Sequence, residues 1–188
     1  SLANNEALVV DGVTPTVSSI TSTTADGTYK AGDAISILIV FTEAVTVTGT
    51  PQLTLETGGS DAVVDYASGS GSAVLTFTYT VGAGENSSDL DYAATGSLAL
   101  NGGTIKDAAG NAATLTLASP GDAGSLAANE ALVVDTTAAT VSGVDSSTAA
   151  GSYKAGDAIS IQVTFTEAMT VTGTPQLTLE TGGSDAVV

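Results

Sequence analysis

The chain has 188 residues, with 20 Asp and Glu against three Lys and Arg, for a formal net charge of -17. This negative charge argues against nucleic-acid partners and anionic membrane surfaces, and it favours solubility and the attraction of cations. The sequence contains no Cys and no His, so disulfides are excluded and zinc or copper sites are not expected.

No apolar run approaches the roughly 18 residues that a membrane-spanning helix needs. We therefore expect no membrane insertion in this segment. Abundant Thr and Val, many Gly and few aromatic residues favour β structure over helix.

The dominant feature of the sequence is an internal repeat. Residues 1–64 align with residues 125–188 without a gap, and 49 of the 64 positions are identical. The offset is 124 residues, a length at which one period can bury its own core. We predict that residues 1–10 are the last strand of a preceding repeat, that 11–134 form a complete repeat, and that 135–188 begin a second, truncated repeat.

Alternating apolar and polar residues predict strands along the complete repeat. The clearest pattern is 159–166, where Ile, Val and Phe alternate with Ser, Gln and Thr, and residues 35–42 keep the same apolar face. Clusters of Gly and Ser separate the apolar runs and predict turns. In chain order, the predicted strands span residues 17–24, 35–42, 52–56, 62–66, 73–81, 97–106, 113–118 and 131–134.

These short strands, with no sustained helical periodicity, predict an all-β protein built of tandem Ig-like β-sandwich domains with antiparallel strands and no helix of note. Half a sandwich would expose its core and its unpaired edges. We therefore expect residues 135–188 to be completed either by further sequence of a longer chain or by another molecule.

Three motifs resemble one class of protein. They lie at 10–17 (a linker that begins Val-Asp), at 41–55 (Phe-Thr-Glu through Thr-Gly-Thr-Pro to Leu) and at 107–111 (Asp-Ala-Ala-Gly-Asn). Together they resemble the bacterial Ig-like, cadherin-like tandem repeats that form the extender regions of giant surface adhesins, many of the repeats-in-toxin type. The sequence departs from the family pattern at Gly12-Val13, where two Thr are usual, and at Ala139, where Pro is usual.

The resemblance implies a secreted protein at the bacterial cell surface, with calcium bound at the junctions between repeats. The Ig-like topology predicts that Asp11, Glu43, Asp107 and Asn111 meet at one end of the complete repeat. Carboxylate, amide and carbonyl oxygens are the ligands that calcium prefers. We therefore predict a calcium site there.

The matching residues of the second junction are Asp135 and Glu167. Simpler interpretations remain open for the first set: Asp107 and Asn111 could cap a tight turn, and Asp11 and Glu43 could be solvated. The acidic cluster at residues 85, 89 and 91 is expected to be a solvated loop.

The leading functional hypothesis is an extracellular extender repeat that projects a distal binding region, with junctions made rigid by calcium. Its partners would be neighbouring repeats of the same chain. One alternative is a self-assembling surface-layer or filament subunit, whose partners would be other copies. A second is a carbohydrate- or receptor-binding module that uses Tyr29, Tyr66 and Tyr92. An enzyme is not expected, because the chain has no His, Cys or Arg.

Overall fold

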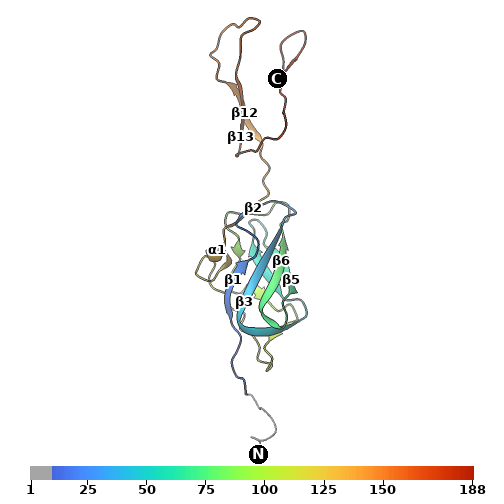
Figure 1. Cartoon of the computed structure of the whole chain (residues 1–188), viewed down its shortest axis with the longest axis vertical. Coiled ribbons are helices and arrows are strands. Elements are labelled where there is room, and N and C mark those ends of the chain that lie inside the picture. Colours follow the sequence, from blue (N-terminus) through green and yellow to red (C-terminus); the bar gives the residue numbers. More distant parts are fainter. Residues whose placement is uncertain (1–9) are drawn as a thin grey trace, which may run out of the picture. The chain divides into compact units, whose positions relative to one another are not determined.

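The computed structural model describes residues 10–188, whose regular secondary structure is almost all β strand, with one short helix (Figure 1). The strands pair mainly antiparallel, which confirms the predicted all-β, antiparallel class. The chain divides into two units, Ser1–Thr137 and Ala138–Val188, and each is described by itself. The strand predicted at 1–10 lies outside the described residues, apart from the exposed Val10.

The first unit contains curled antiparallel sheets and one four-residue helix. Its elements are β1 (Val17–Ser22), β2 (Gly27–Tyr29), β3 (Ala34–Thr48), β4 (Gln52–Glu56), β5 (Ala62–Ser68), β6 (Ser72–Thr80), β7 (Asn86–Ser87), β8 (Asp91–Tyr92), β9 (Leu98–Ala99), β10 (Thr104–Lys106), α1 (Leu126–Asn129) and β11 (Leu132–Asp135).

The long strand β3 organises this unit. It pairs antiparallel with β1 on one side and with β6 on the other, and its last residues pair with β10 (Figure 1). Every second residue from Ile35 to Phe41 is buried, as the alternating pattern predicts. The pairing of β3 with β6 shifts register between Val40 and Val45, so the strand passes through an irregularity and continues to Thr48 rather than ending at Thr42 as predicted.

The core lies between the inward faces of these strands. Buried side chains from β3, β4 and β6 dominate it, and the parallel pair of β2 and β11 closes one edge. Its largest fully buried members are Tyr92, Phe77, Ile20, Ile35, Ile37, Ile39, Leu53, Leu55, Leu75, Leu90, Leu126 and Leu132.

Two further predicted strands differ from the structure. The strand predicted at 97–106 is split into β9 and β10 by a turn in which Asn101 and Gly102 have φ of 47° and 76°. The strand predicted at 113–118 is reduced to isolated bridges at Ala112 and Thr114. Backbone groups of this segment bond in turn to Ile105, Pro15 and Thr95, so no single neighbour supplies a continuous ladder.

The second unit repeats only part of this pattern. It contains β12 (Val141–Ser146), β13 (Ile161–Phe165), β14 (Thr178–Leu179) and β15 (Ala186–Val187). They form two separate two-stranded sheets, and none of residues 138–188 is buried. Within the described residues, no helix of either unit combines the length and apolarity needed to cross a membrane.

Candidate metal site

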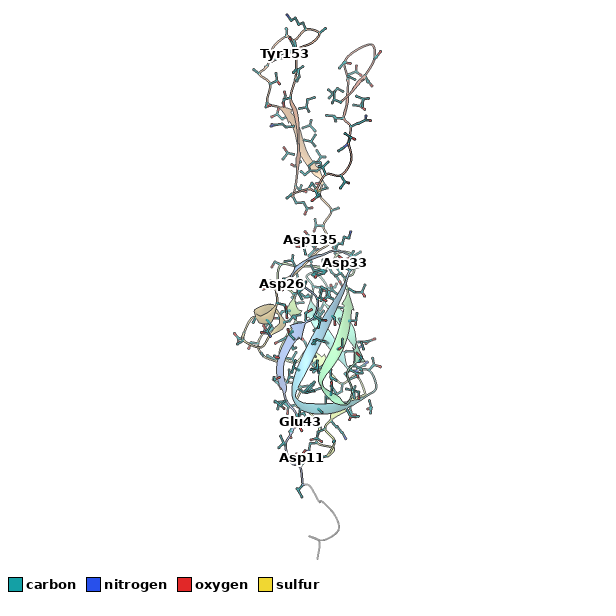
Figure 2. The ribbon with its side chains drawn as sticks, in the orientation of Figure 1. Asp11, Asp26, Asp33, Glu43, Asp135 and Tyr153 are labelled. Atoms are coloured by element: carbon teal, nitrogen blue, oxygen red, sulfur yellow. The ribbon has the colours of Figure 1, made fainter. Side chains whose placement is uncertain are left out.

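Three carboxylates converge at one end of the first unit. One side-chain oxygen from each of Asp11, Glu43 and Asp107 lies within 4.8 Å of the other two. Figure 2 shows Asp11 and Glu43 at this end, below the curved end of β3. The structure therefore brings together residues that are 32 to 96 positions apart in the sequence, as the Ig-like topology predicts.

Glu43 reaches the cluster from inside β3. It occupies the same side of the strand as Phe41 and Val45, which are both buried, and it sits where the β3–β6 register shifts. Its Oε1 atom is buried and has no hydrogen-bond partner among the described residues. Buried carboxylate oxygens are costly without a partner, so this atom is one that a bound cation would satisfy.

Asp107 is held in place by the turn that follows β10. Only 5% of Asp107 is exposed, and its Oδ1 accepts a 2.8 Å hydrogen bond from the backbone N–H of Asn111. Its Oδ2 accepts a 2.7 Å bond from the Asn111 side-chain amide. Gly110, with φ of +97°, provides the left-handed backbone conformation that this tight turn needs. The turn-capping interpretation of Asp107 and Asn111 is therefore correct, and it leaves Asp107 facing the cluster.

Asn111 also fastens the N-terminal linker to this turn. Its amide nitrogen lies 3.2 Å from the backbone oxygen of Asp11 and 3.1 Å from that of Val13. The Asp11 carboxylate in turn accepts the Val13 N–H at 3.0 Å. In this arrangement Asn111 acts as a donor that orients the linker, and coordination of a metal through its amide oxygen stays a prediction.

The surroundings of the cluster disfavour the ionised form of Glu43. Desolvation by burial, and then the charges of Asp11 and Asp107, raise the pKa of Glu43 above its ordinary value. Burial also raises the pKa of Asp107, but hydrogen bonds from Asn111, Gly110 and Ala109 outweigh it, so the net pKa of Asp107 is lowered. The site thus combines a firmly ionised carboxylate with one that its neighbours repel.

The two ligands predicted for the second junction lie in different units. Asp135 ends β11, pairs with Asn86 of β7, and accepts the Thr137 N–H at 2.9 Å, as Asp11 does with Val13. Figure 2 shows it at the end of the first unit opposite Glu43. Glu167 is exposed and follows β13 in the second unit. Their pairing stays a prediction.

Two other acidic residues, which the sequence placed in a solvated loop, have structural roles. Asp91 is 7% exposed and accepts N–H groups of Gly121 at 2.9 Å and Leu126 at 3.3 Å, which fastens the segment leading into α1. Glu85 accepts 2.6 Å hydrogen bonds from the Tyr79 hydroxyl and the Gly82 N–H. Sequence spacing gave no sign of the Asp91 role, because Gly121 and Leu126 lie 30 and 35 residues away. It gave no sign that Glu85 turns back to bond Tyr79 in β6.

Comparisons of the chain with protein-family models, with curated proteins and with solved structures found no match. The functional argument therefore depends on the acidic cluster and on the repeat itself.

Proposed function

We propose that this chain is an extracellular extender segment of a large bacterial surface adhesin, built of Ig-like sandwich repeats, whose acidic cluster binds calcium. The observation that carries the proposal is the meeting of Asp11, Glu43 and Asp107 within 4.8 Å, with a Glu43 oxygen left unpartnered. An all-oxygen donor set suits a hard divalent cation. The motifs at 10–17, 41–55 and 107–111 support the adhesin assignment.

The proposed mechanism is mechanical. Asp11 belongs to the linker that precedes β1, whereas Glu43 and Asp107 belong to the body of the first unit. A cation shared by the three replaces carboxylate repulsion with coordination, and it fixes the linker to the domain. Calcium takes six to eight oxygen ligands at about 2.3–2.6 Å, so backbone carbonyls or water would complete the shell. A stiffened linker in each repeat turns a string of domains into a rod.

Thermal melting of the chain in calcium and in chelator tests the ion. At a free calcium concentration 100 times the dissociation constant, one site adds about 2.7 kcal/mol, which raises the Tm of a domain of this size by about 10 °C. Glu43→Gln and Asp107→Asn should lose most of this increase. Asp89→Asn removes an exposed carboxylate and is the matched control. Equal Tm values in calcium and in chelator would contradict the proposal.

Small-angle scattering tests the mechanical role. A chain of two consecutive complete repeats should have a larger and better-defined maximum dimension in calcium than in chelator. The same chain carrying Glu43→Gln in both copies should not respond. If calcium binds but the dimensions stay the same, the ion stabilises single domains and the spacer hypothesis loses its support.

A self-assembling surface-layer or filament subunit is the second candidate. It is favoured by the exposed apolar residues of the second unit, which include Ile159, Val163 and Phe165. The carbohydrate-binding alternative gains no such support. The Tyr29 and Tyr66 hydroxyls bond to backbone groups of Ala25 and Ser70, and Tyr92 is buried, so these rings form no exposed stacking platform.

A further inference from the structure

The strands β5 and β6 of the first unit separate along part of their length. They are neighbours in the sheet (Figure 1), but among the described residues their antiparallel ladder has only two pairs and ends at Tyr66 and Phe77. Continuing that register by one residue would pair Asp65 with Thr78. This pair is not formed, so the two strands diverge beyond Tyr66 and Phe77.

The two strand edges that face each other across this gap have no strand partner among the described residues. Residues 62–65 of β5 pair with β4 on the other side of the strand, and residues 78–80 of β6 pair with β3 on the other side. An open cleft of about 630 Å³ occupies the gap, lined by residues 61–67, residues 78–80 and Glu85. Both edges therefore offer backbone N–H and C=O groups to a strand that enters the cleft.

The outer face of β5 beside the cleft has a regular pattern of acidic and apolar side chains. Asp61, Val63 and Asp65 are exposed and alternate with more buried residues, so the three share one face. Val63 is 59% exposed, which is unusual for a valine within a strand. The Gln52 side-chain amide holds the Asp65 carboxylate through a 2.9 Å hydrogen bond. Glu85 adds a third carboxylate to the cleft, and no Lys or Arg lines it.

We propose that this cleft docks an extended basic segment of another protein, in which two basic residues lie four positions apart with an apolar residue midway between them. The segment adds as a strand to the free edge of β5, so that main-chain hydrogen bonds supply affinity. Its basic side chains then face Asp61 and Asp65, and its apolar side chain faces Val63. Opposite charges and apolar groups directly across a ladder stabilise the pairing, so the spacing of the three residues selects the partner.

Charge identifies the occupant as a different protein rather than a second copy of this chain. The basic residues of this chain are Lys30, Lys106 and Lys154, so no segment of it carries two of them four positions apart. A second copy would also bring a formal net charge of -17, which repels the first. A single metal ion suits the cleft less well than the candidate metal site. Within the described residues, only the cluster at that site brings carboxylate oxygens of three residues within 4.8 Å of one another.

The test uses the full chain in chelator, so that its outcome does not depend on the calcium site. The probe is a fluorescent peptide with Lys-Thr-Val-Thr-Lys at its centre and Gly-Ser at each end. We expect saturable one-to-one binding by fluorescence anisotropy, with shifts of the amide NMR signals of residues 61–67 and 78–80. Two control peptides keep the charge: one has the order Lys-Lys-Thr-Val-Thr, and one is N-methylated at the central Thr-Val-Thr. Both should bind at least tenfold more weakly, because the first loses the spacing and the second loses the main-chain donors.

Two double variants separate the cleft from the general acidity of the chain. Asp61→Asn combined with Asp65→Asn should weaken binding of the probe at least tenfold. Asp89→Asn combined with Asp122→Asn removes the same charge from exposed positions outside the cleft, and it should bind as the parent chain does. Absence of binding, equal binding by the two double variants, or NMR shifts only at residues outside the cleft would overturn the proposal. Equal binding of the peptide with adjacent lysines would do the same, because it would show attraction without register.

Discussion

At the scale of single residues, Glu43 shows a conflict between folding and site chemistry. It follows the inward-facing series of β3, where its neighbours Phe41 and Val45 are buried apolar residues. An apolar residue would extend the core at this position, whereas the carboxylate has an unpartnered oxygen and two charged neighbours. A residue that costs stability in the metal-free protein is the kind expected at a binding site.

The pH dependence of the metal-free protein follows from this conflict. Because the folded-state pKa of Glu43 is above its unfolded value, ionisation of Glu43 destabilises the fold, and protonation relieves the cost as the pH falls from neutral towards 4.5. Asp107 has the opposite effect on stability, but only at lower pH. Its pKa is lowered, so the stability that its ionised form contributes is lost only as the pH falls below the ordinary value of 3.8. In chelator, the Tm should therefore rise as the pH is lowered from 7 to 5.

Differential scanning calorimetry of the parent chain and of Glu43→Gln checks this prediction. The variant should melt higher at pH 7 and should show a smaller rise on acidification. A Tm that falls between pH 7 and pH 5, or an equal rise in both proteins, would show that Glu43 does not carry the effect. In calcium, the Tm increase of the parent chain over its value in chelator should shrink as the pH falls, because protons compete with calcium for the carboxylates.

Asn111 should matter more than an ordinary turn residue. Its amide joins the Asp107 carboxylate to the backbone oxygens of Asp11 and Val13, so Asn111→Ala leaves several acceptors without a donor. We expect a loss of about 1–3 kcal/mol in the free energy of unfolding by urea, together with weaker calcium binding. Asn101→Ala is unsuitable as a control, because Asn101 has a positive φ. Asp89→Asn serves instead and should change neither quantity.

The sequence predicted which carboxylates meet but not how they are held. Asp11, Glu43 and Asp107 were predicted from a topology, and they do converge. The strand predicted at 35–42 continues to Thr48 in β3, so Glu43 is presented from within the strand, at a register shift. The bonds that Asn111 donates to the linker could not be read from spacing, because Asp11 and Val13 lie about 100 residues away.

At the scale of secondary-structure elements, β3 and β13 share one alternating sequence pattern, but their apolar side chains are buried to different extents. Ile39 and Val163 are aligned positions, and their exposed fractions are 0% and 40%. Ile39→Ala should therefore lower the free energy of unfolding by about 2–5 kcal/mol, through lost burial and the cavity it leaves. Val163→Ala should change it by no more than about 0.5 kcal/mol.

Urea denaturation followed by far-ultraviolet circular dichroism measures both variants in one background. The comparison is internal, because the two variants lie at aligned positions of one chain. A large loss for Val163→Ala would mean that the second unit is covered in solution. That result would favour self-association through the second unit.

Strands with strict alternation and one dominant neighbour were predictable, and segments that bond to several neighbours were not. The alternation at 35–42 and 73–81 corresponds to β3 and β6, which pair with each other over seven residues in continuous register. The segment at 113–118 has the same kind of alternation, but its backbone bonds go to different elements. Periodicity reports which face is buried, and it does not report whether a neighbouring strand runs alongside.

At the scale of the whole molecule, the two copies separate local from tertiary stabilisation. The segment Tyr-Lys-Ala-Gly-Asp occurs at 29–33 and again at 153–157. Both copies keep the same turn, in which the Lys N–H donates to the Asp carboxylate at 3.0 Å and 2.9 Å. Only the first copy is also bonded to the end of β6, through two 2.9 Å bonds that join Gly32 and Asp33 to Val81.

Limited proteolysis with trypsin can measure this difference, because trypsin cleaves after Lys and Arg and the chain has only three such residues, Lys30, Lys106 and Lys154. Cleavage requires local unfolding of the chain around the bond. Lys154 lies in a unit with no buried residue, whereas Lys30 and Lys106 lie in the unit that holds the core. Trypsin should therefore cut after Lys154 first and release residues 155–188, while the bond after Lys30 survives at least tenfold longer despite its identical local sequence.

Mass spectrometry of timed digests measures the order of cleavage. Calcium should slow the later cut after Lys106, which adjoins the acidic cluster at Asp107, and it should leave the cut after Lys154 unchanged. Equal rates at Lys30 and Lys154 would mean that the local turn, rather than pairing with β6, determines how readily this sequence opens.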